Sequence, residues 1–212
     1  MQKINTTQMV RMLVKVCDTV ASNQELLSKL DSFVGDGDHG VTVARGFTAV
    51  KNRLLTTSDI STTLLLEAVG DTLSETMGGA IGPIFGALFS GMATHATDLI
   101  GADDMAAMFR AGLESVTLIG GAKQGDSTLV DALAPAVYAM ENATSNFSTL
   151  RDSMQDASKA ARAGAEATRD MIAKKGRAKF LQEKSLGYQD AGATSMAIVI
   201  ETMAIFCANE NA

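Results

Sequence analysis

The sequence lacks tryptophan altogether, and only 5% of its 212 residues are aromatic. The core must therefore be built from Ala, Leu, Val, Ile and Met, residues that suit close packing between helices. Only two prolines occur, which leaves room for long uninterrupted helices. The two cysteines, Cys17 and Cys207, stand within apolar helical patterns, and we predict that they are buried free thiols in a reducing cytosol.

Runs of basic residues are also absent, and the formal net charge is -6. An acidic chain of this kind is a poor nucleic-acid ligand, because such binding depends on neutralising phosphates. The N-terminal residues do not form a signal peptide, since Arg11 and Lys15 interrupt their apolar run. The most apolar later segment, residues 77–93, contains glycines and Pro83 and is too short to span a bilayer. We therefore expect a cytoplasmic protein that binds neither nucleic acid nor membranes.

Hydrophobic periodicity is helical through almost the whole chain. In residues 103–120 the apolar side chains recur every three or four residues, with Asp103 or Asp104 as a cap at the start and Gly120 at the end. Residues 150–172 carry a seam of mostly small residues, which implies a close neighbouring helix. Similar patterns cover residues 7–21, 41–54, 62–76, 83–97, 128–141 and 193–208. No segment shows the sustained alternation of a strand.

These patterns predict an all-α fold, an antiparallel barrel or bundle of about eight or nine helices, with residues 1–212 forming a single domain. Four connections between the helices are rich in glycine and polar residues: 35–40, 78–82, 120–127 and 187–192. In an up-and-down bundle alternate connections lie at the same end. We therefore expect several of these four loops to converge on one ligand.

Three aspartates, Asp31, Asp36 and Asp38, fall within eight residues of the stretch LDSFVGDGDHGVTVARG. Carboxylates this close repel one another and do not suit a core. Hard oxygen ligands at short spacing on a loop suit a hard divalent cation such as Mg²⁺, held beneath the phosphates of a nucleotide. On spacing alone, the alternative that they are helix caps and turn formers stays open. His39, directly after them, could contact a phosphate, transfer a proton or stack on a base, or could simply be solvated. His95, by contrast, is predicted to be a structural residue of a helix.

The loop MGGAIGPIFG, residues 77–86, also has phosphate-binding character. Gly78, Gly79 and Gly82 expose backbone amides just before a helix start, where phosphate can bind. The loop is not a Walker motif, because no Gly-Lys-Ser/Thr follows. A second interpretation stays open, in which Gly82, Gly86 and Ser90, spaced four residues apart, let two helices touch.

Three later segments add polar groups near helix ends. GDST places Asp126, Ser127 and Thr128 at a helix start, where plain capping is the alternative to ligand binding. KKGRAKF places Arg177 after a glycine expected to end the long helix, and its guanidinium could fork onto a phosphate. Lys174 and Lys175 need no function, since lysines near a helix C-terminus interact favourably with its dipole. GYQDAGATS adds Asp190 and Gly192 before the last helix.

Taken together, the segments GDGDHG, GGAIGPIFG, GDST, KGRAKFL and GYQDAGATS resemble the DhaL family, the nucleotide-binding (ADP-binding) subunits of dihydroxyacetone kinase. They occur in the family's order and span essentially the whole chain. The resemblance implies a barrel of eight antiparallel helices with the nucleotide in loops at one end. It also implies that Asp31, Asp36 and Asp38 hold two Mg²⁺ ions that bridge the phosphates of ADP or ATP. The nucleotide contacts that it implies are His39, Thr42, Gly79, Ala80, Ile81, Gly82, Gly125, Thr128, Leu129, Arg177, Asp190 and Gly192.

The resemblance further implies a phosphotransferase subunit that passes a terminal phosphoryl group to dihydroxyacetone held by a partner subunit. We expect a phosphoenolpyruvate-dependent enzyme, a kinase in which bound ADP is recharged in place by a phosphocarrier subunit. Two alternatives stay open: a subunit of a split ATP-dependent kinase for dihydroxyacetone or another ketose, and a non-enzymatic nucleotide-loaded module that binds a transcription regulator. An inert helical scaffold is disfavoured by the aspartate cluster.

The chain offers no obvious base and no covalent anchor for a carbonyl, so we assign no catalytic residue and expect no triose phosphorylation by this chain alone. A homodimer is left open. Five positions depart from the family pattern. Ile81 stands where a small polar residue is usual, Thr42 and Ala44 where asparagines are frequent, Tyr188 for a histidine and Ala191 for a proline. They bear on the base and ribose contacts and not on the aspartates.

Overall fold

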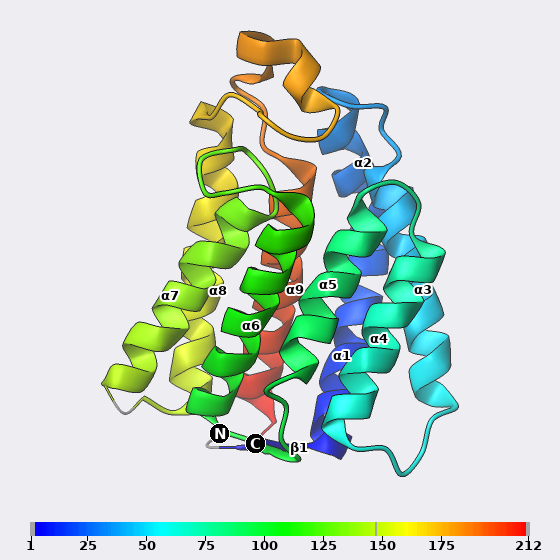
Figure 1. Ribbon diagram of the computed structural model, residues 1–212, viewed down its shortest axis with the longest axis vertical. Coiled ribbons are helices and arrows are strands. Elements are labelled where there is room, and N and C mark those ends of the chain that lie inside the picture. The colour runs from blue at the N-terminus through cyan, green and yellow to red at the C-terminus, as the bar shows by residue number, and fades with distance from the viewer. Residues whose placement is uncertain (1–2, 147, 211–212) are drawn as a thin grey trace.

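The computed structural model describes residues 3–146 and 148–210, and these are almost entirely helical (Figure 1). Two two-residue strands, β1 (Ile4–Asn5) and β2 (Leu99–Ile100), pair antiparallel and are too short to show a strand pattern in the sequence. The α-helices are α1 (Thr6–Ser22), α2 (Gln24–Ser32), α3 (His39–Leu55), α4 (Thr62–Thr76), α5 (Ile81–Ala93), α6 (Ala102–Gly120), α7 (Val130–Ser145), α8 (Leu150–Ala167) and α9 (Ala191–Asn209). Two 3₁₀ segments, η1 (Thr168–Asp170) and η2 (Ala178–Ser185), lie between α8 and α9.

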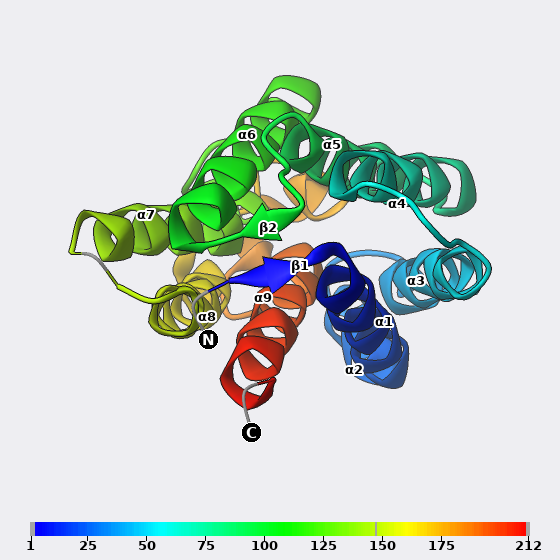
Figure 2. The same cartoon turned by 90° about the horizontal axis from the view of Figure 1, so that it is seen from below.

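Eight of these helices form a closed ring, which Figure 2 shows end-on. α1 packs on α3, each helix from α3 onward packs on the next, and α9 packs back on α1. Successive helices of the ring run in opposite directions (Figure 1). The predicted all-α antiparallel barrel is therefore confirmed. The short helix α2 follows the upper end of α1 in Figure 1 and packs against α3 and α9.

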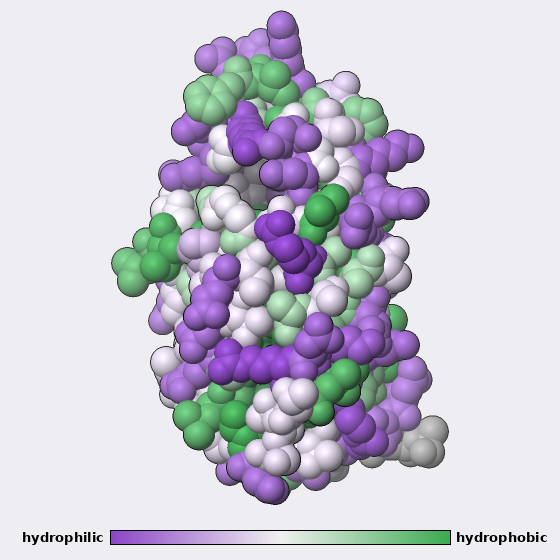
Figure 3. Space-filling view, turned by 90° about the vertical axis from the view of Figure 1, so that its right-hand side faces the viewer, coloured by the Kyte–Doolittle hydropathy of each residue, from purple (hydrophilic) through white to green (hydrophobic). Residues whose placement is uncertain are grey.

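The core inside the ring consists of aliphatic, methionine and a few phenylalanine side chains, as the composition predicts. Phe47 and Phe85 meet edge-to-face with 5.5 Å between ring centroids. Cys17 and Cys207 are buried free thiols, as predicted, and burial raises both pKa values to about 12. Helix α9 is long and apolar enough to cross a membrane, but 72% of that stretch is buried inside the protein, as in a core helix. On the face shown in Figure 3, hydrophilic residues predominate and hydrophobic ones occur in small groups.

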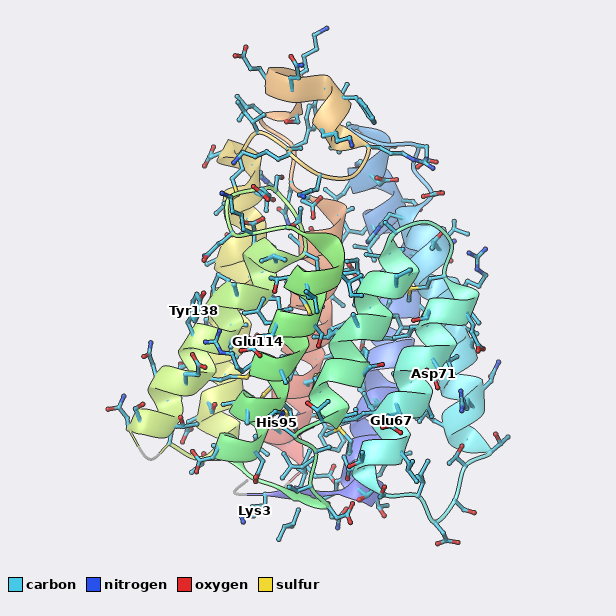
Figure 4. All side chains as sticks on the ribbon, viewed as in Figure 1. Lys3, Glu67, Asp71, His95, Glu114 and Tyr138 are labelled. Atoms are coloured by element: carbon cyan, nitrogen blue, oxygen red, sulfur yellow. The ribbon has the colours of Figure 1, made fainter. Side chains whose placement is uncertain are left out.

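Several helix boundaries depart from the prediction. The helix predicted over 150–172 ends at Ala167, where the Thr168 hydroxyl donates to the carbonyl of Ala165 (2.6 Å) and a 3₁₀ turn follows. The helix predicted over 83–97 is Ile81–Ala93, and exposed His95 lies in the turn after it (Figure 4). The helix predicted over 128–141 is Val130–Ser145. Helix α2 was not predicted, because it is short and buries only Leu27.

Glycines allow the closest helix contacts, as one interpretation of Gly86 requires. A Cβ at Gly86 would lie 1.9 Å from the Ser74 hydroxyl and 2.9 Å from the carbonyl of Gly70, so α4 and α5 touch through glycine. On the other side of the ring, a Cβ at Gly164 of α8 would lie 2.0 Å from the carbonyl of Asp131 in α7. That carbonyl has no intrahelical partner, because the residue four positions on is Pro135, which has no amide hydrogen.

Because successive helices run in opposite directions, the connections between them lie alternately at the two ends of the barrel. The upper end in Figure 1 holds the connections α1–α3, α4–α5, α6–α7 and α8–α9. The lower end holds the β1–β2 pair and both ends of the described chain. The four glycine-rich loops therefore gather at one end, as the sequence predicts.

Candidate functional site

A cavity of about 350 Å³ opens among these four connections. Its volume is within the range of small-molecule sites. The structure brings most of the residues predicted to bind metal or nucleotide to its wall: Asp31, Asp36, Asp38, His39, Thr42, Gly79, Ala80, Ile81, Thr128, Leu129, Arg177, Asp190 and Gly192. Gly82 and Gly125 are not among the lining residues. Gly82 packs against the carbonyl of Met77, and the amide of Gly125 donates to the carboxylate of Asp131 (2.5 Å).

The three aspartates converge on one side of the cavity. Asp31 lies in the last turn of α2, and Asp36 and Asp38 lie in the turn that leads into α3. One carboxylate oxygen of each lies within 4.8 Å of the others. Gly35 makes the turn possible, since a Cβ there would lie 2.3 Å from Asp31 Oδ1. Three converging anionic oxygens are a donor set that fits Mg²⁺.

A glycine also fixes where Asp31 lies. A Cβ at Gly40 would lie 2.0 Å from the carbonyl of Gln24 and 2.6 Å from the amide nitrogen of Ser28. Helix α2 therefore lies directly against the first turn of α3. This contact carries Asp31 over the α3 N-terminus, where its Oδ2 is 3.4 Å from the amide nitrogen of His39.

Four helix N-termini point toward the cavity, because α3, α5, α7 and α9 all begin at this end. Their first turns supply lining residues, among them His39, Ile81, Val130 and Ala191. Helix N-termini carry unpaired amides and a partial positive charge, which favour bound anions. Of these four helices only α9 has a side-chain N-cap, since Asp190 Oδ1 accepts from the amide of Ala193 (2.6 Å).

The segment of residues 171–189, which we call the strap, brings cations to the cavity. Arg177 forms an ion pair with Asp36, and both line the cavity. Lys175 also lines it, although a helix dipole seemed enough to explain this lysine in the sequence. That interpretation was wrong, because α8 ends at Ala167 and Lys175 lies well beyond it. The phosphate-binding expectation for Arg177 stays a prediction.

The opposite part of the cavity is apolar. Ile81 and Ile84 come from the start of α5, Val116 from the end of α6, and Leu129 and Val130 from the start of α7. The same site therefore has a charged half, made by α2, α3 and the strap, and an apolar half, made by α5, α6 and α7. Sequence periodicity could not separate Ile84 and Val116 from the core, since both continue the buried stripes of their helices.

Burial shifts the pKa values of two lining residues. The pKa of His39 is lowered, chiefly by burial, although the charge of Asp31 opposes the shift. Its Nε2 lies 3.2 Å from the hydroxyl of Ser195, which itself donates to the carbonyl of Gly192 (2.9 Å). Burial therefore favours the neutral imidazole, and the ring is hydrogen-bonded to Ser195. The pKa of Asp190 is raised to about 7, first by burial and then by the nearby carboxylates of Asp131 and Asp31.

The loop between α6 and α7 contains two site residues with other roles than expected. Ser127, for which capping was the alternative, lines the cavity and caps nothing. Asp131, not singled out from the sequence, is buried and accepts from the amides of Gly125 and Thr128 (2.8 Å). The sequence feature that could have identified Asp131 is a carboxylate inside an otherwise apolar helical pattern, three residues after Thr128.

Comparison with known proteins gives consistent matches. Residues 33–205 match the family model described as the DAK2 domain. The chain is 34% identical over 204 residues to the "PEP-dependent dihydroxyacetone kinase, ADP-binding subunit DhaL" of Escherichia coli, covering 95% of this chain and 97% of that one. It is also 34% identical over 190 residues to an L-erythrulose kinase of Pectobacterium atrosepticum, covering 88% of this chain but only 32% of that protein.

A solved structure shares the fold. The dihydroxyacetone kinase from C. freundii, in complex with AMP-PNP and Mg²⁺, superposes with a TM-score of 0.73 at 27% sequence identity. The match covers 97% of this chain and 35% of that one, so this chain spans about a third of the solved kinase.

Proposed function

The chain belongs to the DAK2-domain family, and from this premise we propose that it is the nucleotide-binding subunit of a dihydroxyacetone kinase. The observation that best supports this proposal is that the cavity has a charged half and an apolar half. Its charged half, with Asp31, Asp36 and Asp38 beside Arg177, suits the phosphates and their metal ions, and its apolar half suits the nucleoside. The similarity to a subunit described as ADP-binding and to a kinase solved with AMP-PNP and Mg²⁺ supports the same ligands.

Asp31, Asp36 and Asp38 would hold two Mg²⁺ ions at the charged half. Magnesium neutralises phosphate charge and orients the terminal phosphoryl group for in-line transfer. The chain's own residues supply the rest of the binding. Arg177 reaches the phosphates from the strap, the uncapped N-terminus of α5 with Gly79 and Ala80 offers amides, and neutral His39 contacts the nucleotide.

No group in the cavity is placed to anchor a ketone, among the residues that the structure describes. His39 is already hydrogen-bonded to Ser195, and the aspartates face one another. The acceptor, dihydroxyacetone, is therefore held by a partner subunit that presents its hydroxyl at the cavity mouth. On this basis the protein alone binds nucleotide without turning over a triose.

For the phosphoryl donor we propose a phosphoenolpyruvate-dependent phosphocarrier subunit that recharges bound ADP. Relatives of this kind from Escherichia coli and Lactococcus lactis are both matched over 97% of their length. A second candidate is an ATP-exchanging kinase for dihydroxyacetone or another ketose, which the similarity to an L-erythrulose kinase favours. The first kind should retain ADP, whereas the second must release it at every turnover.

The deciding experiment is to purify the protein without added nucleotide, denature it and chromatograph the supernatant on an anion exchanger. We expect about one ADP per chain. A nucleotide-free protein that binds Mg-ATP on titration would favour the ATP-exchanging kinase. Absence of both bound nucleotide and Mg²⁺-dependent binding would contradict the proposed function.

A matched pair of variants tests the aspartates. Asp38→Asn should lower the affinity for Mg-ADP by at least about 10–100-fold, the loss typical of altered metal surroundings. Asp71→Asn removes an equally exposed carboxylate from the outer face of α4 and should leave the affinity unchanged (Figure 4). Equal affinities for Asp38→Asn and the wild type, measured by calorimetry, would remove the metal assignment.

A further inference from the structure

Ser127 is held in a conformation that a serine rarely adopts. Its φ is +56°, in the left-handed region, where a side chain is disfavoured and glycine is the usual residue. Such a conformation persists only where the surroundings enforce it, and it is most often found at functional sites. The backbone of Ser127 therefore requires an explanation beyond a simple helix start.

The surroundings do enforce this conformation, through two side chains that clamp the loop. Asp131 accepts from the amides on both sides of Ser127, at Gly125 (2.5 Å) and Thr128 (2.8 Å). Lys174 of the strap holds the loop from outside. Its amide donates to the carbonyl of Asp126 (3.0 Å), and its ammonium group donates to the carbonyl of Gly125 (3.1 Å) and lies 3.4 Å from the Asp126 carboxylate.

The clamped loop directs Ser127 to the cavity. The residue is only 7% exposed, lines the cavity, and makes no side-chain hydrogen bond to any described residue. Its neighbour Thr128 differs, because its hydroxyl accepts from the amide of Val130 (3.2 Å). The Ser127 hydroxyl is not sealed off from the cavity, and a ligand bound there can supply the hydrogen-bond partner that the described residues do not.

We propose that Ser127 is a further nucleotide-binding residue, whose hydroxyl forms a hydrogen bond to the bound nucleotide. The strain of its backbone maintains that orientation before the ligand arrives. This inference rests on the proposed function, and it concerns a residue for which the sequence left capping and ligand binding both open.

Two substitutions distinguish the effect of the Ser127 hydroxyl from the effect of its strained backbone. Ser127→Ala removes the hydroxyl and keeps the strained backbone. Ser127→Gly removes the hydroxyl and also relieves the strain. Asp59→Gly is the matched control, because Asp59 has a similar φ of +52° in the exposed loop between α3 and α4, at the opposite end of the barrel.

The measurements are calorimetric titration with ADP and Mg²⁺, after nucleotide is stripped with EDTA, and thermal melting without ligand. Both Ser127 variants should bind Mg-ADP about tenfold more weakly, the weight of one hydrogen bond. Ser127→Gly and Asp59→Gly should each raise the Tm of the ligand-free protein by about 2–4 °C. Ser127→Ala should have the Tm of the wild type. Asp59→Gly should bind Mg-ADP with the affinity of the wild type.

Wild-type affinity in both Ser127 variants would overturn the proposed contact. A Ser127→Gly variant that melts no higher than the wild type would overturn the role of strain. Failure of the proposed function has a different signature, since the folded wild type would then bind no Mg-ADP at all, and the inference would fall with it.

Discussion

At the residue scale, Asp190 combines two roles that oppose each other. Its carboxyl caps α9 through the amide of Ala193, whereas its burial makes ionisation costly and raises its pKa. The group lines the cavity near Asp31 and Asp131, whose charges add to the cost. The site thus contains a capping residue whose charged form the ligand-free fold disfavours.

The raised pKa of Asp190 predicts a loss of stability with rising pH. Below pH 3.8 the carboxyl is protonated in both the folded and the unfolded protein. Between this value and about pH 7 only the unfolded protein releases the proton, so folding stability falls by about 1.4 kcal/mol for each unit of raised pKa and then levels off.

Asp190→Asn tests this prediction, because an asparagine also caps helices but does not ionise. Urea unfolding in EDTA should show the variant to be more stable than the wild type at pH 8 and similar to it at pH 4. Asp170→Asn, at an exposed position, should follow the wild type at both pH values. If Asp190→Asn and the wild type lose stability in parallel from pH 4 to pH 8, the Asp190 carboxyl does not carry the effect.

At the element scale, the contact between α7 and α8 joins the barrel wall to the site. Pro135 leaves the carbonyl of Asp131 without an intrahelical bond, and Gly164 lets α8 approach that carbonyl directly. The side chain of the same Asp131 clamps the loop that holds Ser127. A change in the distance between α7 and α8 should therefore displace Asp131 and, with it, the loop that lines the cavity.

Gly164→Ala should destabilise the fold and weaken Mg-ADP binding together. Alanine gains about 1 kcal/mol in helix propensity, but its Cβ would lie 2.0 Å from a backbone carbonyl, and overpacking of this kind costs about 1–3 kcal/mol. Chemical denaturation and titration with Mg-ADP measure the two effects. Ala163→Ser, one residue away on the exposed face of α8, is the control and should change neither. A more stable Gly164→Ala variant would show that α7 and α8 separate freely.

The sequence predicts the bounds of a helix well where the hydrophobic periodicity extends over many residues. It predicts them less well where a single hydrogen bond determines the end of the helix. The long stripes of α4 and α6 gave bounds within a residue, whereas the end of α8 depended on the Thr168 hydroxyl. The aspartates and Arg177 could be proposed because their chemistry is unusual for loops. Val116 and Lys175 could not, because only the assembled barrel shows that an apolar helix residue and a lysine line the same cavity, and for Ser127 the sequence left capping and ligand binding both open.

At the scale of the whole molecule, the cavity joins all four helical hairpins of the barrel, since each contributes a connection to its wall. A ligand held there contacts segments that are far apart in the sequence. Its binding energy therefore stabilises the whole ring and not one loop alone.

Magnesium removal should show this linkage. At ADP concentrations about 100-fold above Kd, bound Mg-ADP adds about 2.7 kcal/mol to the free energy of unfolding, which raises the Tm by roughly 5–10 °C. In excess EDTA the shift should disappear, and with Mg²⁺ present Asp38→Asn should show about half of the wild-type shift or less. Thermal melting followed by circular dichroism provides the measurement. A shift that persists undiminished in EDTA would mean that the nucleotide is held without the metal.

Both ends of the described chain lie at the end of the barrel away from the cavity (Figures 1 and 2). A biotin, a fluorophore or a solid support attached at either end would thus sit on the far side from the cavity mouth. Immobilised in this orientation, the protein would present its open face to solution. Sensor surfaces prepared this way could test ligand binding on uniformly oriented molecules.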